Sequence, residues 1–140
     1  MNEPPEISAN SDATLRAIAA AYAYVACADG SYDHRESSRF EGLLKELPGL
    51  AQESMVRAQS YLSDFVRGFQ LDFAEGLETA ESAVHQLRGE KGLGQLVLRA
   101  AQVALISDGR LVQVEENALR RICEALDMEE GAGGGDVPHR

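Results

Sequence analysis

Two short stretches of this 140-residue chain carry the same pair of acids around a glycine. Asp29 is followed directly by glycine and seven residues later by Glu36, and Asp108 is followed in the same way by glycine and Glu115. The two stretches are offset by 79 residues. Carboxylate oxygens are the hard ligands that calcium and magnesium prefer. The four acids are therefore candidate ligands of a divalent cation.

The spacing of each copy matches only half of a known calcium loop. Aspartate, glycine and the later glutamate correspond to positions five, six and twelve of an EF-hand, where the glutamate is bidentate. Positions one and three would be Val25 and Cys27 in the first copy and Ala104 and Ile106 in the second, and all four are apolar. A complete EF-hand is excluded. If the copies pack about a pseudo-two-fold axis, the four acids face one another in one shared site. Calcium is the expected cation, with another divalent ion such as magnesium as the alternative.

A purely structural interpretation of the same residues stays open. Asp-Gly is a common turn and helix-end signal, and Asp33 with Glu36 has the spacing of a capping box. In the second copy Val112 stands where Asp33 would be and cannot cap, yet Glu115 is retained. The glutamates are therefore either cation ligands or parts of turns and caps.

Other residues with chemical potential have simpler explanations. His34 adjoins the first turn and could add a nitrogen ligand, but an exposed residue in a first helical turn is the simpler interpretation. Cys27 and Cys123 match apolar positions of the repeat and lack CxxC spacing, which favours packing. Glu81 and His85 share a helix face, although di-iron bundles use Glu-x-x-His on two helices. The chain has no nucleophile elbow, P-loop or zinc-protease motif, so we expect a non-enzymatic protein.

Apolar residues recur at intervals of three and four, which predicts an all-α protein. Ser11 or Asp12 is the expected N-cap of the first helix. The segment Leu93–Ser107 is apolar on most of its circumference, so we expect it to be the central, most buried helix. The predicted helices are Asp12–Ala28, Asp33–Leu47, Gln52–Phe69, Asp72–Leu87, Leu93–Ser107 and Val114–Met128.

The helices beside the two turns follow the same 79-residue offset, which makes an internal repeat. The matched apolar positions are Tyr32 with Leu111, Phe40 with Leu119, Leu43 with Ile122 and Leu47 with Leu126. We therefore expect a compact single-domain bundle of about six to seven helices with an internal two-fold repeat. Residues 1–11 form a predicted flexible N-terminal segment, 12–128 the helical domain, and 129–140 a flexible glycine-rich tail.

The charge balance limits the partners that the chain can have. It holds 23 acidic and 13 basic residues, a net charge of −10, and a pI near 4.7. Nucleic-acid binding depends on neutralising phosphates with basic residues and is disfavoured. The negative charge of the protein instead favours cations or a basic protein surface as partners. The longest strongly apolar stretch, Ala17–Ala28, has 12 residues, too few to span or insert into a membrane. With no secretory signal pattern at the N-terminus, we expect a cytoplasmic protein.

The stretches Ala26–Glu36 and Ile106–Glu115 resemble the two signature turns of the TerB-like family. That family comprises tellurite-resistance TerB proteins and the related domain of DjlA-type co-chaperones. The resemblance covers about residues 12–128 and implies a compact, non-enzymatic all-α domain. It also implies an acidic surface linked to divalent-metal binding, and a role in the bacterial stress response. The acidic positions of the family fall on Asp29, Glu36, Asp108 and Glu115.

Two functions follow as expectations. The first is a TerB-like domain that binds a divalent cation between its turns and associates with other stress-response proteins, membrane-associated ones among them. The alternative is a metal-free acidic module for protein–protein interaction. No organic cofactor and no nucleic-acid partner are expected. Tyr24 and Tyr61, placed off the apolar stripes, are candidate anchors for a protein partner.

Overall fold

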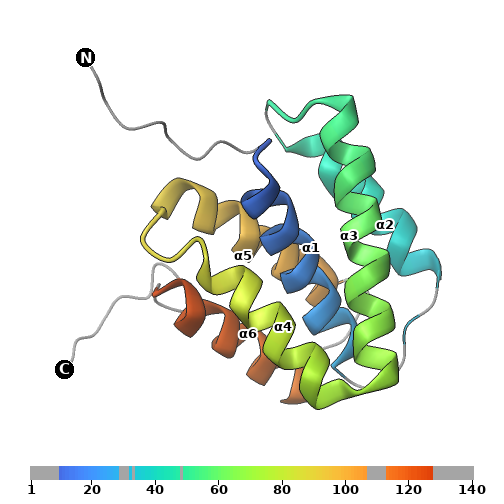
Figure 1. The fold of residues 1–140 in the computed structure, drawn as a ribbon, viewed down its shortest axis with the longest axis vertical. Coiled ribbons are helices and arrows are strands. Elements are labelled where there is room, and N and C mark those ends of the chain that lie inside the picture. The colour runs from blue at the N-terminus through green and yellow to red at the C-terminus, as the bar shows by residue number, and fades with distance from the viewer. Residues whose placement is uncertain (1–9, 29–31, 33, 48, 107–112, 128–140) are drawn as a thin grey trace.

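The structure, a computed structural model, describes residues 10–28, 32, 34–47, 49–106 and 113–127. Its described part contains helices and no strands, so the predicted all-α class is confirmed. The described residues form six helices, at the lower end of the predicted number (Figure 1). They are α1 (Asp12–Cys27), α2 (His34–Glu46), α3 (Gln52–Leu71), α4 (Phe73–His85), α5 (Lys91–Ile106) and α6 (Gln113–Leu126).

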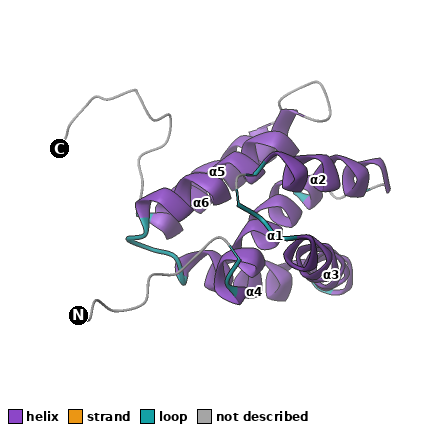
Figure 2. Cartoon of the chain, turned by 90° about the horizontal axis from the view of Figure 1, so that it is seen from above, coloured by secondary structure: helices purple, strands orange, loops and turns teal. Residues whose placement is uncertain are grey.

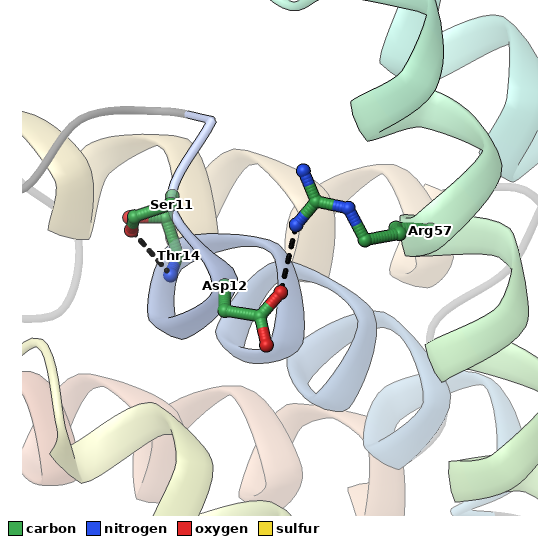
Figure 3. Close-up of polar contacts among 4 residues, drawn as sticks. All are labelled: Ser11, Asp12, Thr14 and Arg57. Atoms are coloured by element: carbon green, nitrogen blue, oxygen red, sulfur yellow. Dashed lines mark hydrogen bonds and ion pairs between the residues drawn. The ribbon is translucent and has the colours of Figure 1, made fainter.

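Local hydrogen bonds explain where α1 and α4 begin. The Ser11 side chain caps α1, because its Oγ accepts a 3.2 Å hydrogen bond from the backbone N–H of Thr14 (Figure 3). Asp72 alone separates α3 from α4, and its Oδ1 accepts a 3.2 Å bond from the N–H of Glu75. One residue therefore ends one helix and caps the next, which folds α3 and α4 into a tight hairpin.

The central helix is α1, which corrects the expectation that the fifth helix is the most buried. Every residue from Thr14 to Cys27 is buried except Arg16. Helix α5 is apolar on a comparable share of its surface, but Gln95, Arg99 and Gln102 are exposed. The difference is one of position, since α1 contacts α3, α4, α5 and α6. Figure 2 shows α1 between the α3–α4 hairpin and the pair α5 and α6.

The helix boundaries confirm the repeat. Shifted by 79 residues, Asp12–Cys27 coincides with Lys91–Ile106, and the shifted α2 ends one residue before α6 does. The two pairs also exchange contacts, because α1 packs on α5 while α2 contacts α5 and α6 contacts α1. In Figure 1, α1 and α5 both run toward the lower right, and α2 and α6 both run back toward the upper left. The arrangement is that of two similar helix pairs packed through their first helices.

The equivalent positions of the two pairs are also buried alike. Four such pairs, all buried, are Ile18 with Val97, Val25 with Ala104, Leu43 with Ile122 and Leu47 with Leu126. None of the helices in the described part combines the length and apolar character that crossing a bilayer requires.

Candidate functional site

The structure places only part of the predicted metal set. Glu36 lies in the first turn of α2, and its side chain is described. Glu115 lies at the corresponding third position of α6, of which only the backbone is described there. Asp29 and Asp108 lie outside the described residues. The shared four-carboxylate site therefore stays a prediction.

Glu36 is the one buried charged side chain in the described part of the chain, with 5% of its surface exposed. Acidic side chains are almost never buried to this extent unless they are paired or hydrogen-bonded. The backbone of the same residue is also held, because the hydroxyl of Tyr22 donates a buried 2.7 Å hydrogen bond to the Glu36 carbonyl. Tyr22 is itself fully buried, and its ring packs 4.9 Å from that of Phe40. The start of α2 is thus fixed against α1 with its acid turned inward.

A second hydrogen bond holds the described part of the first turn. The hydroxyl groups of Tyr32 and Ser37 lie 2.9 Å apart, which connects the turn to the outer side of α2. The second copy cannot make the Tyr22 bond, because Ala101 occupies the equivalent position on α5. The two halves of the repeat therefore share their helix boundaries and their acids, but the hydrogen bond of the Tyr22 hydroxyl is specific to the first half.

Tyr22 lies on the apolar stripe of the first predicted helix, and that pattern alone does not reveal the role of its hydroxyl. The available signal was a tyrosine, rather than a phenylalanine, on an apolar stripe seven residues before Asp29. A buried tyrosine needs a partner for its hydroxyl, and here the partner is the backbone carbonyl of Glu36.

The remaining candidates do not form a metal centre. No group of three or more His, Cys, Asp or Glu side chains suited to a metal occurs among the residues that the structure describes. His34 is exposed at the first position of α2. Cys27 and Cys123 are buried and are not joined in a disulfide, in keeping with the prediction that they are packing residues. Glu81 forms a 2.7 Å ion pair with Arg121 of α6.

The two tyrosines considered as partner anchors have other roles. Tyr24 is 5% exposed, and its ring stacks on Phe69 at 5.9 Å, so the expectation of a surface anchor is wrong for this residue. Burial raises the pKa of its hydroxyl. Tyr61 is half-buried, and its hydrogen bond with Asp12 raises the pKa of Tyr61. It is part of a polar cluster at the start of α1.

Comparison with known proteins gives one family. The family model described as Tellurite resistance protein TerB matches residues 15–132. Searches of curated proteins and of solved structures return no match. The family match includes all six helices apart from the first turn of α1, and it spans both acidic turns. Because it covers far more than half of the chain, the protein belongs to the TerB family.

Proposed function

We propose that this protein is a non-enzymatic TerB-family domain that binds a divalent cation, with calcium expected, through Asp29, Glu36, Asp108 and Glu115. Occupancy of the site would favour association with other proteins of a bacterial stress response. The observation that carries the proposal is the burial of Glu36 in the first turn of α2. A cation bound to this carboxylate would replace the hydration that burial removes, and the net charge of −10 favours cation binding.

The repeat supports a shared site rather than a single loop. Glu36 and Glu115 are each the third residue of helices that occupy equivalent places in the two halves. The first helices of the halves, α1 and α5, pack directly on each other. A cation between the turns would then draw two ligands from each half, in keeping with the six to eight oxygens that calcium takes once water and carbonyl groups are added.

The metal-free alternative rests on a specific observation as well. An acid in the first turn of a helix interacts favourably with the positive end of the helix dipole, and this holds for Glu36 without any ligand. Under this alternative the turns are architectural, and the net charge of −10 serves to dock a basic partner protein.

The experiment is a thermal melt of chelator-stripped protein with millimolar calcium, magnesium or zinc. A ligand at 100 times its dissociation constant adds about 2.7 kcal/mol of stability. For a domain of this size that corresponds to a rise in Tm of roughly 8–13 °C. We expect the largest rise with calcium.

Two variants separate a specific site from general screening of negative charge. The double variant Asp29→Asn with Asp108→Asn should lose the calcium-dependent rise. Glu53→Gln is the matched control, since Glu53 is an exposed acid in the first turn of another helix, α3. An equal calcium response in both variants would contradict the shared site. Absence of any response to the three ions would leave the metal-free module.

A further inference from the structure

A cavity of about 480 Å³ lies between the first half of α1 and the outer face of α4. This volume is within the range of small-molecule sites. Its polar lining combines a guanidinium, a carboxylate, two hydroxyls and an amide over two alanines. The lining residues are Ala13, Arg16, Glu78, Thr79, Ser82, Ala83 and Gln86.

Each of the two helices contributes one small side chain to the lining of the cavity. Ala83 on α4 is buried and Ala13 on α1 is half-buried, whereas the polar lining residues of α4 are exposed. A leucine at either alanine would occupy part of the space. The cavity thus has two alanines in its lining and is otherwise polar, a composition that suits a polar rather than an apolar molecule.

Arg16 is the only residue of α1 beyond its first turn that is not buried, and its guanidinium is positioned by two aromatic rings. The guanidinium carbon lies 5.3 Å from the ring centroid of Tyr61 and 5.6 Å from that of Phe65. Contact with a ring face engages the plane of the guanidinium and leaves its N–H edges available. Within the described residues, Arg16 has neither an ion pair nor a hydrogen bond to a side chain.

Asp12 is close enough to Arg16 for their charges to interact, but its hydrogen bonds are with other residues. Asp12, one turn earlier on α1, accepts a 2.7 Å hydrogen bond from Arg57 of α3, and Figure 3 shows its carboxylate turned toward that arginine. The hydrogen bonds from Tyr61 and Arg57 lower the pKa of Asp12, which keeps the acid charged and committed to α3. Arg16 is therefore left as an oriented cation at the cavity.

We propose that this cavity binds a small zwitterion of the α-amino acid type, with its carboxylate on Arg16 and its ammonium on Glu78. A planar carboxylate matches the fork of a guanidinium and binds it through two parallel hydrogen bonds. Glu78 in the same cavity disfavours a multiply charged anion and favours a ligand that also carries a positive group. The hydroxyl of Ser82 and the amide of Gln86 supply further polar contacts.

The surroundings of Glu78 favour a basic side chain on the ligand. Glu78 and Ser82 also line a second cavity, of about 490 Å³, which continues along α4 toward α6. Glu81 and Glu124 are part of its lining, and Arg121 is paired with Glu81. L-Lysine should therefore bind more tightly than L-glutamate. This ligand site involves none of the four acids proposed to hold a cation, so either proposal can fail without the other.

The test is a titration of the ¹⁵N-labelled chain with L-lysine, followed by amide chemical shifts. We expect saturable shifts confined to the first half of α1 and to α4. L-Lysine methyl ester, which lacks the carboxylate, and L-glutamate should each bind about tenfold more weakly or worse, since charged hydrogen bonds are lost or opposed.

Variants of Arg16 test whether this arginine binds the carboxylate of the ligand. Arg16→Gln should weaken lysine binding about tenfold or more, and Arg16→Lys should weaken it less because the charge over the rings is kept. Arg99→Gln is the matched control, an exposed arginine of α5 that pairs with Glu46. Equal binding by the methyl ester, equal affinities of Arg16→Gln and Arg99→Gln, or no localised shifts with any probe would overturn the proposal.

Discussion

Replacing Gly76 with alanine should loosen the α3–α4 hairpin, because the two helix backbones meet there. A Cβ atom at this position would lie 2.9 Å from both the Cα and the N of Phe69, and 3.0 Å from its Cδ1. Carbon atoms pack best at about 3.5–4.0 Å, so the helices would have to separate by roughly half an ångström or more. Backbone atoms cannot rotate away as a flexible side chain can.

The magnitude follows from two opposing terms. Overpacking costs up to about 3 kcal/mol, and a clash with backbone belongs at the upper end of that range. Alanine recovers about 1 kcal/mol relative to glycine within a helix. The net loss in the free energy of unfolding of Gly76→Ala is therefore about 2 kcal/mol. For a domain of this size that is roughly 6–10 °C in Tm.

Urea denaturation followed by circular dichroism would measure the effect, with two glycines as matched controls. A Cβ atom added to Gly42 in α2 would have nothing within 4 Å, so Gly42→Ala should stabilise the protein by about 0.5–1 kcal/mol. Gly68, on the α3 side of the hairpin, would place a Cβ at 4.0 Å from the Gly76 Cα, an ordinary contact, so Gly68→Ala should also stabilise the protein by about 0.5–1 kcal/mol. A Gly76→Ala variant as stable as the native protein would refute the close approach of the helices.

Three further predictions test the remaining contacts. Tyr22→Phe removes the buried hydroxyl from the Glu36 carbonyl and should cost about 1–2 kcal/mol in urea denaturation, whereas Tyr32→Phe, at a half-buried pair, should cost less. Hydrogen bonds from Tyr61 and Arg57 lower the pKa of Asp12, so this carboxyl contributes stability above about pH 4 that is lost as the pH falls through its lowered folded-state pKa. In the Asp12→Asn variant the Tm should therefore fall less steeply over that acidic range. A Tm profile unchanged from that of the native protein would count against the cluster of Asp12, Tyr61 and Arg57. Cys27 and Cys123 are both buried, so a thiol reagent should label neither in the native protein and both in denaturant. Rapid labelling of either thiol without denaturant would show that its helix is not packed as described.

Local patterns in the sequence were sufficient to define the elements of the fold. Apolar spacing and cap residues predicted six helices whose ends differ from the observed ones by at most two residues. The offset between the two acidic turns also predicted that α1 and α5, and α2 and α6, would correspond. Helix boundaries depend on signals within a few residues of each end, such as Ser11 before α1 or Asp72 before α4, and those signals can be read from the chain alone.

The sequence predicts only part of the candidate metal site. Residue type and spacing singled out Glu36, because an acid at a repeated position after an Asp-Gly turn is a recognisable pattern. Its burial was not predictable, since a first-turn glutamate is normally exposed. The backbone of Glu36 is held by the hydroxyl of Tyr22 on α1, which lies 14 residues earlier in the chain, so the placement of the glutamate depends on a tertiary contact.

What the sequence by itself determined was the helical class, the repeat, the family and the identity of the acidic candidates. Only the tertiary structure decided that α1 rather than α5 is central, and that Tyr24 packs inside while Arg16 remains at a cavity. The sequences of α1 and α5 are similarly apolar, so their patterns could not show which of the two helices is more buried. Burial depends on how many neighbours surround a helix, and the α3–α4 hairpin packs against α1 on the side away from α5.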